Sequence, residues 1–244
     1  MDNPLPGAVG LSHISAYDWP AADGVRGGSP HMHLACAEAY VVTAGEGAVQ
    51  TLTPDGYTET PLHPGAVAWF TPGTVHRMIN GDGALRITVL MQNSGLPEAG
   101  DAVFTFPAEI LADPDRYAEA AALPAKEGPA ADAAAHRRRD LAVEGYLVLR
   151  EALSQGDPEP LRDFHRAAAR LVAPRVAAWR DRWRQGALAA AQATGAVLDA
   201  LEKADPAHLW QARVTSTGPT REAGYGMCGR RQEYEVPGAT LPQQ

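Results

Sequence analysis

The stretch PHMHLACAEAYVVTAGEG, from Pro30 to Gly47, places two histidines and a glutamate at close, fixed spacings in a β-like run. Successive side chains of a strand point to opposite faces, so His31 and His33 share one face. Glu38 follows His33 after four intervening residues, which is enough chain for a bend to bring its carboxylate back beside them. The run therefore predicts three metal-ligating side chains close together in a β structure.

A fourth candidate ligand lies farther along the chain, in the stretch GAVAWFTPGTVHRMIN from Gly65 to Asn80. His76 in this stretch would come from another strand. Three imidazoles and one carboxylate suit a borderline divalent cation, namely Fe, Mn, Ni, Co or Zn. All four groups must be deprotonated to bind it, so we expect the affinity for metal to fall in acid.

The remainder of the first half also has the pattern of β structure. Residues 39–62 predict a strand, a tight turn at Pro-Asp-Gly and a second strand, and residues 84–93 predict a further strand. Short strands separated by glycine and proline favour a sandwich or a barrel. Alternation along the last strand would place Leu85, Ile87, Val89 and Met91 on one face and Arg86, Thr88 and Gln92 on the other.

Two motifs in these strands resemble those of the cupin superfamily, over roughly residues 25–92. The first cupin motif is His-x-His, three or four residues, Glu, six residues and Gly, and it is matched by His31, His33, Glu38 and Gly45. The second runs from a glycine through Pro and Gly to His and Asn, and it is matched by Gly65, Pro72, Gly73, His76 and Asn80. Pro72 and Gly73 are adjacent here, where the family usually has one residue between them.

The resemblance implies a mainly β fold, the cupin double-stranded β-helix or jelly-roll barrel, with one divalent metal ion in its mouth. It places that ion on His31, His33, Glu38 and His76, as in small bacterial metal-binding cupins. Cupins commonly pair through their barrels, so a homodimer is expected as well. Nothing in the resemblance covers residues 111–244.

The second half of the chain is alanine-rich and predicts helices. We expect a cupin domain over residues 1–110 and a helical region over 111–244 that packs on the barrel or at a dimer interface. Three Asp-Pro pairs, at 113, 157 and 205, suit helix N-termini. An irregular tail is expected from about residue 212, with Cys228 in it, and the cluster HRRRD at 136–140 is expected on a solvated helix face.

Several further side chains are candidates for the same cavity. Glu38 and Tyr40, two residues apart, are the candidate catalytic groups, although a tyrosine at this position also suits simple packing. Arg86 and Gln92 would line a substrate pocket if their strand face points inward, where an arginine suits a carboxylate or phosphate, and would only be solvated if it points outward. Met78 would line the pocket with apolar surface.

Composition limits the partners and the location. The net charge of −8 argues against nucleic acid as a partner. No stretch approaches the roughly 20 apolar residues of a membrane helix, and the first residues do not resemble a secretory signal. Two cysteines cannot form a disulfide framework, so we expect a cytoplasmic protein.

These observations predict a metal-dependent enzyme that acts on a small oxygenated metabolite, by dioxygenase, isomerase or lyase chemistry. The alternative is a non-catalytic cupin that binds a metal or a small molecule as a sensor or binding module. Fold and metal together do not select a reaction, and the sequence does not name the substrate.

Overall fold

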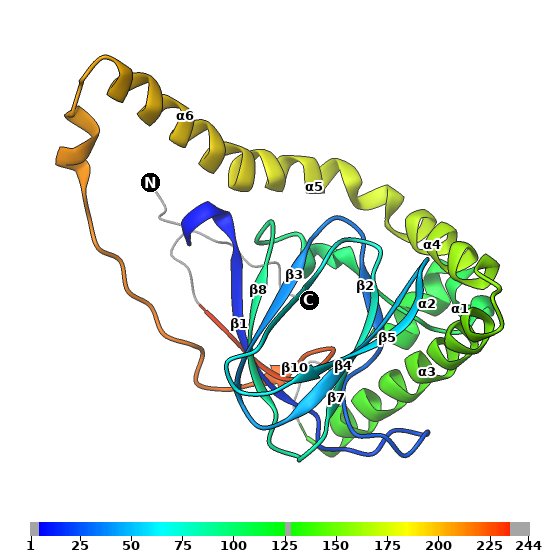
Figure 1. Ribbon diagram of the computed structural model, residues 1–244. Helices are drawn as coiled ribbons and strands as arrows, with labels where there is room; N and C mark the ends of the chain where they lie inside the picture. The colour runs from blue at the N-terminus through cyan, green and yellow to red at the C-terminus, as the bar shows by residue number, and fades with distance from the viewer. Residues whose placement is uncertain (1–4, 125–127, 235–244) are drawn as a thin grey trace.

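Two antiparallel sheets form the centre of the molecule in the computed structural model, which describes residues 5–124 and 128–234 (Figure 1). The six-stranded sheet has the order β10-β11-β1-β8-β3-β6, and the five-stranded sheet has the order β5-β4-β7-β2-β9. The strands are β1 (Gly10–Ala16), β2 (His31–His33), β3 (Glu38–Ala44), β4 (Gly47–Thr53), β5 (Gly56–Leu62), β6 (Val67–Phe70), β7 (Val75–Asn80), β8 (Arg86–Met91), β9 (Ala102–Phe104), β10 (Gly224–Tyr225) and β11 (Gly229–Glu233).

The sheets enclose an apolar core made from the inward faces of their strands. On β8 the predicted alternation is confirmed, because Ile87 and Val89 are buried while Arg86 and Leu90 are exposed. The strand ladders of the described residues do not link the two sheets into a closed barrel. The expected jelly roll is therefore present as two facing sheets rather than as a fully hydrogen-bonded barrel.

The predicted strand over residues 39–53 is in fact two strands in different sheets. β3 ends at Ala44 and pairs with β6 and β8, whereas β4 begins at Gly47 and pairs with β5 and β7. The chain crosses between the sheets at Gly45, which has φ +71°. A Cβ there would lie 2.4 Å from the carbonyl carbon of Ala84, so both the backbone conformation and the space require glycine. The predicted turn at Pro-Asp-Gly does join two paired strands, β4 and β5.

The second half of the chain contributes the helices. Asp113 caps α2 as predicted, because its carboxylate accepts hydrogen bonds from the backbone N–H groups of Asp115 and Arg116. No helix among the described residues is both long and apolar enough to cross a membrane. The helices are α1 (Ala108–Leu111), α2 (Pro114–Ala121), α3 (Pro129–Ser154), α4 (Glu159–Val172), α5 (Val176–Trp183) and α6 (Ala189–Glu202), with short helical turns η1 (Pro6–Ala8), η2 (Pro97–Asp101), η3 (Ala173–Arg175), η4 (Arg184–Leu188) and η5 (Ala207–Gln211).

Helix α3 packs against the five-stranded sheet with its backbone in close contact. Gly145 is the contact point, since a Cβ there would lie 2.0 Å from the backbone oxygen of Thr105, just after β9. The Thr105 hydroxyl donates a hydrogen bond to the carbonyl of Ala142 at 2.7 Å. Farther along α3, the Tyr146 hydroxyl donates to the side chain of Gln50 on β4 at 3.2 Å. These contacts join the helical region to the sheets.

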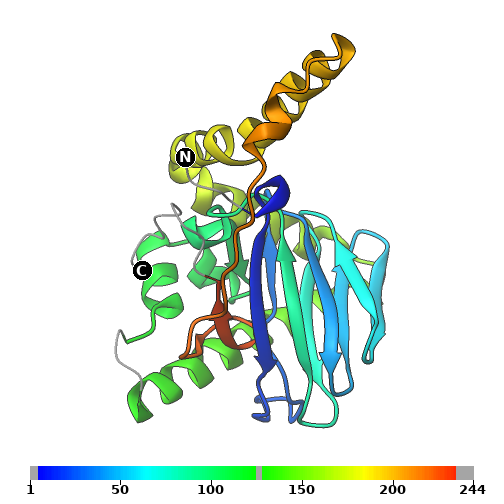
Figure 2. The ribbon, with the colours of Figure 1, turned by 90° about the vertical axis from the view of Figure 1, so that its left-hand side faces the viewer.

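Helices α5 and α6 extend away from the sheets as an arm, and the chain then returns to them (Figures 1 and 2). After residues 212–223, which contain no helix or strand, β10 and β11 add to the six-stranded sheet beside β1. The prediction of an irregular tail is therefore wrong for residues 224–233. The run GRRQE at 229–233 has no apolar alternation, so its pairing with β1 depends on the fold and not on a local pattern.

Candidate metal centre

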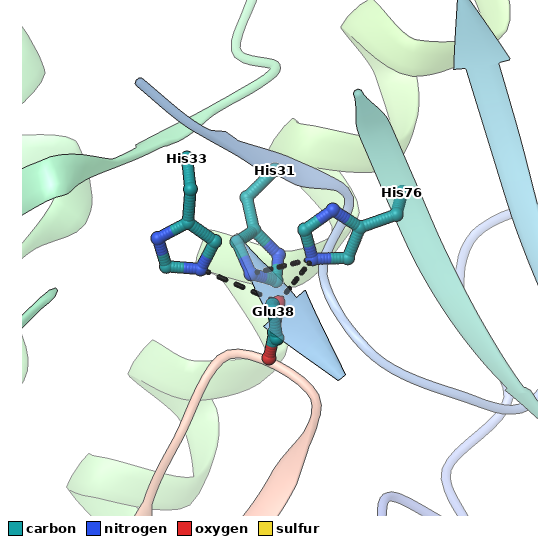
Figure 3. A group of neighbouring side chains, drawn as sticks. All are labelled: His31, His33, Glu38 and His76. Atoms are coloured by element: carbon teal, nitrogen blue, oxygen red, sulfur yellow. Dashed lines mark hydrogen bonds and ion pairs between the residues drawn. The ribbon is translucent and has the colours of Figure 1, made fainter. Parts of the chain in front are cut away.

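The four predicted ligands lie together, with one candidate donor atom from each within 4.8 Å of all the others (Figure 3). His31 and His33 are on β2, and His76 is directly opposite His31 on the neighbouring strand β7. Glu38 is the first residue of β3 and reaches across from the other sheet. All four side chains are buried, with at most 6% of any residue exposed. The two sheets thus bring together ligands that the sequence separates by up to 45 positions.

Each imidazole is oriented by a partner on its outer nitrogen. The Nδ1 atoms of His31 and His76 lie 2.9 Å and 3.1 Å from the backbone oxygens of Ser29 and Thr74. A carbonyl oxygen can only accept a hydrogen bond, so both Nδ1 atoms carry the proton. In the neutral ring the Nε2 atom then has a free lone pair, and both Nε2 atoms point to the centre of the cluster. This is the arrangement of metal-ligating histidines, whose second nitrogen is held by an outer partner.

The inner atoms fit a cation. The Nε2 atoms of His31 and His76 are 3.1 Å apart, and the Oε2 atom of Glu38 lies 3.1 Å from Nε2 of His76 and 3.4 Å from Nε2 of His33. Neighbouring ligands of a first-row metal, bound at about 2.1 Å, are about 3 Å apart. Oε2 of Glu38 is buried and has no hydrogen-bond donor among the described residues. A metal ion would satisfy this oxygen and the facing lone pairs at the same time.

Protonation within the cluster follows from burial and charge. Burial and the neighbouring His76 lower the pKa of His31 well below its usual value. Burial also opposes the charged form of His33, but Asp101 and Glu38 outweigh it and raise the pKa of His33 to about 9. For Glu38, burial favours the protonated form, but His33 and His76 hold its pKa well below the usual range. Without metal, the cluster at neutral pH therefore contains a carboxylate and a charged His33.

Because metal must displace the proton of His33, we expect metal binding at pH 7 to release about one proton. The apparent affinity should rise about tenfold per pH unit up to about pH 9, the pKa of His33, and level off above it. Isothermal titration calorimetry in buffers of different ionisation enthalpy measures this release. Metal affinity that is independent of pH between 6 and 8 would contradict the expectation.

Asp101 is a part of the site that the sequence analysis missed. Its carboxylate is fully buried, accepts a hydrogen bond from Nδ1 of His33 at 3.0 Å, and accepts another from the backbone N–H of Ala35 at 2.7 Å. It comes at the end of η2, 68 positions after His33, and belongs to neither motif. Only the folded structure brings it beside the ligands.

Replacing Asp101 by asparagine should weaken metal binding about 10- to 100-fold, because His33 loses the anion that orients it and raises its basicity. Competition with a chromophoric chelator measures the change. Ser94→Ala, a substitution at the rim of the same cavity and outside the ligand set, is the control and should leave the affinity unchanged. Equal affinities of the wild type and Asp101→Asn would show that this carboxylate only supports the backbone of residues 34–35.

A cavity of about 620 Å³ opens onto the cluster and is lined by His31, His33 and Glu38 but not by the fully buried His76. Further lining residues come from β1, β8, α3, the segment 94–98 and the C-terminal segment. Figure 3 shows the loop between β10 and β11 passing next to Glu38. Cys228 in this loop is buried and lines the cavity, so it is not the tail residue that the sequence analysis expected.

The predicted pocket residues other than the ligands lie elsewhere. Arg86 and Gln92 are exposed, because they are on the outer face of the six-stranded sheet, and the prediction that they line the pocket is wrong. Met78 is fully buried in the core and does not line the cavity. Tyr40 is also fully buried, and its hydroxyl lies 3.6 Å from Sγ of Cys228. Cys228 lines the cavity, whereas Tyr40 does not. Burial raises the pKa of Tyr40 well above 10.

The sequence analysis expected the cluster HRRRD on a solvated helix face, and this prediction is wrong for two of its arginines. Residues 136–140 lie inside α3, and Arg138 and Arg139 are buried. Arg139 donates hydrogen bonds to the backbone oxygens of Trp19 and Pro20, at 2.8 Å each. Arg138 lines the cavity. A run of arginines has no apolar periodicity, so the sequence pattern predicts an exposed helix face even where the helix contacts a sheet.

The comparisons with known proteins agree with this architecture. Residues 17–112 match the family model described as Cupin. This part of the chain is a cupin domain, a member of the cupin superfamily with the double-stranded β-helix fold, and the helical region follows it. No protein with a curated description matches the sequence.

Solved structures match only in part. A protein with a double-stranded β-helix domain from Klebsiella pneumoniae is 19% identical, with 34% of this chain and 64% of that chain covered and a TM-score of 0.27. WlaRA, a TDP-fucose-3,4-ketoisomerase from Campylobacter jejuni, is 17% identical over 34% and 58%, with a TM-score of 0.28. QdtA, a sugar 3,4-ketoisomerase from Thermoanaerobacterium thermosaccharolyticum in complex with TDP, is 17% identical over 34% and 57%, with a TM-score of 0.28. The match thus spans less than two thirds of each of these proteins, and the likeness is one of fold.

Proposed function

We propose that this protein is a metal-dependent cupin enzyme that acts on a small oxygenated metabolite, with one divalent ion held by His31, His33, Glu38 and His76. The observation that carries the proposal is the convergence of three Nε2 atoms and one carboxylate oxygen beside a cavity of 620 Å³ that three of the four residues line. Such a volume accommodates a small metabolite. When bound, the metal would act as a Lewis acid that polarises a carbonyl or hydroxyl oxygen of the substrate.

The protein's own residues would hold and orient the substrate. Glu38 is both a ligand and the one carboxylate of the cluster that faces the cavity, so we propose it as the group that accepts a proton there. The hydroxyls of Ser12, Ser94 and Tyr225 line the same walls and would orient an oxygen-rich molecule. The C-terminal segment forms part of the cavity wall and would help to exclude water from it.

Metal analysis tests the proposal. Untagged protein purified without chelator should contain about one equivalent of a divalent metal per chain. Iron would favour dioxygenase chemistry, tested next by oxygen uptake, whereas manganese, nickel, cobalt or zinc would favour isomerase or lyase chemistry. Absence of metal after reconstitution with each of these ions would contradict the proposal.

Turnover separates the enzyme from its alternative, a non-catalytic metal-binding or small-molecule-binding cupin. Metal-loaded protein would be incubated with a panel of small hydroxy acids, keto acids and sugars, and products would be followed by mass spectrometry. Product formation that is lost on removal of the metal supports the enzyme. Binding of a panel member without turnover of any would favour the sensor or binding module.

We also propose that the protein is a homodimer. The arm and the chain that follows it to residue 214 expose large apolar side chains that no other part of the described chain covers, and a second copy would bury them. Light scattering of the full chain should give twice the mass of one chain, and a clean monomer mass would contradict the proposal. The exposed residues are Leu198, Leu201, Leu209, Trp210 and Val214.

A cytoplasmic location is a further proposal. Cys36 and Cys228 are both buried and are not joined in a disulfide, which suits a reducing compartment. Cell fractionation with an antibody to the chain tests it, and recovery of the protein outside the cytoplasmic fraction would contradict it.

A further inference from the structure

The cavity contains a buried guanidinium that no carboxylate among residues 5–124 and 128–234 neutralises. Arg138 on α3 is only 9% exposed and lines the cavity together with His31, His33 and Glu38. None of the ion pairs formed among the described residues includes Arg138. A buried charge is ordinarily paired, because its desolvation is otherwise uncompensated.

The hydrogen bonds of Arg138 are incomplete as well. Its two terminal nitrogens donate to the backbone oxygens of Ala121 at 3.3 Å and Gly226 at 3.0 Å, and its Cζ lies 5.0 Å from the ring centroid of Phe104. Its Nε–H is buried and has no acceptor among the described residues. The side chain is thus held in place by neutral partners while one of its donors stays free. A guanidinium remains charged under such conditions.

The other charged groups of the cavity do not fill this role. Arg231 also lines the cavity, but it is paired with Glu233. Glu98 accepts a hydrogen bond from the backbone N–H of Gly95 at 3.0 Å and forms no ion pair with Arg138. Within the part of the chain that the structure describes, Arg138 is therefore the arginine of the lining that forms no ion pair.

Arg138 is also close to the metal ligands. Phe104, whose ring stands 5.0 Å from Arg138, has its centroid 6.4 Å from the ring centroid of His31. The Cζ atom of Arg138 and the ring centroid of His31 are therefore at most about 11 Å apart, and both residues line the same cavity.

We infer that the ligand of this cavity is a small carboxylate, bound by Arg138 at one end and presenting a hydroxyl or carbonyl oxygen to the His31, His33, Glu38 and His76 cluster at the other. A carboxylate is planar and accepts hydrogen bonds from a guanidinium at close range, so it would supply the missing negative charge. The position of the oxygen end rests on the proposed metal-dependent function, whereas the Arg138 subsite does not.

This subsite depends on the helical region. Arg138 lies outside residues 17–112, so the cupin domain alone does not contain it. The same side chain donates a hydrogen bond to Gly226, in the loop that lines the cavity. One arginine would thus link the appended helix, this loop and the choice of substrate.

Binding of matched ligands tests the inference. Calorimetry would compare three hydroxycarboxylates (glycolate, 3-hydroxypropionate and 4-hydroxybutyrate) with the diols of the same length (ethylene glycol, 1,3-propanediol and 1,4-butanediol). Metal-free and metal-loaded full-length protein would both be titrated. We expect at least one carboxylate to bind about 10-fold or more tightly than its diol in both forms, since a charge-assisted hydrogen bond distinguishes them.

Variants assign the preference to Arg138. Arg138→Gln should bring the carboxylate-to-diol ratio close to one with the metal content unchanged, and Arg138→Lys should restore part of it because the charge is kept. Arg137→Gln, the same change on an exposed neighbour, should leave the ratio as in the wild type. Thermal melts show whether each variant folds.

The outcomes separate the two proposals. Equal binding of carboxylates and diols by wild-type protein overturns the inference without any variant. A preference that survives in Arg138→Gln, or that is present only with metal, also overturns it, because the metal alone would then hold the carboxylate. A protein that binds no metal but prefers carboxylates through Arg138 would support the subsite and contradict the proposed function.

Discussion

Replacing His76 by alanine should lower the affinity for a divalent metal by about 100-fold or more while the fold is retained. His76 supplies one of four ligand atoms, and its loss should cost more than the loss of a partner that only orients a ligand, which typically costs up to about 100-fold. It is fully buried yet does not line the cavity, so the substitution should act on the metal directly. Competition titration and elemental analysis measure the affinity and the occupancy.

The fold should survive because the apolar core of the two sheets is made by other residues, such as Val42, Val75 and Ile87. Far-UV circular dichroism of His76→Ala should therefore match that of the wild type. His63→Ala is the matched control, since this histidine is exposed and lies outside the cluster, and its metal affinity should be unchanged. Global unfolding of His76→Ala would show that the cluster is structural, and unchanged affinity would exclude His76 as a ligand.

The cluster of candidate ligands was predictable from the sequence, whereas the residues that support it were not. His31, His33 and Glu38 lie within eight residues of each other, where strand alternation alone relates their directions. Asp101 contacts His33 from 68 positions farther along the chain, and Arg138, which is farther still, lines the cavity. Neither residue stands out in its local sequence. The pairing of β2 with β9 brings Asp101 to His33, and the packing of α3 brings Arg138 to the cavity.

The substrate-pocket predictions failed for a related reason. A strand pattern shows which residues share a face but not which face is buried when both carry mixed side chains. On β8 the apolar set Ile87, Val89 and Met91 takes the interior, so Arg86 is directed outward. The arginine of the cavity comes instead from a helix whose charge run suggested exposure. The C-terminal strands were missed because β11 is polar along its whole length and is defined only by its ladder with β1.

The second large effect should come from Gly145→Ala, a substitution far from the ligands. Alanine is favoured over glycine in a helix by about 1 kcal/mol, so helix propensity alone predicts a more stable protein. Here, however, the new Cβ would lie 2.0 Å from the backbone oxygen of Thr105 and 2.9 Å from the carbonyl carbon of Phe106. These backbone atoms cannot rotate away as a side chain could, so α3 or the segment just after β9 must move. We expect a net loss of about 2–3 kcal/mol, the usual range for overpacking.

Gly195→Ala is the matched control, because Gly195 lies inside α6 with no atom within 4 Å of its Cβ position. This variant should gain about 0.5–1 kcal/mol, since only helix propensity changes. Urea unfolding of both variants, followed by circular dichroism, measures the two free energies of unfolding. Equal effects of the two substitutions would contradict the close contact of α3 with the sheet.

The contact at Gly145 should also connect stability to the site. The Thr105 hydroxyl donates to Ala142 of α3 and lies 3.3 Å from the backbone oxygen of Pro30, the residue before His31. Displacing α3 would thus disturb the start of β2, and it would carry Arg138 away from the cavity wall. Gly145→Ala should therefore lose carboxylate preference and metal affinity together, even at temperatures where it is folded. A variant that is destabilised but binds metal and carboxylates like the wild type would show that the helix supports the sheet without shaping the cavity.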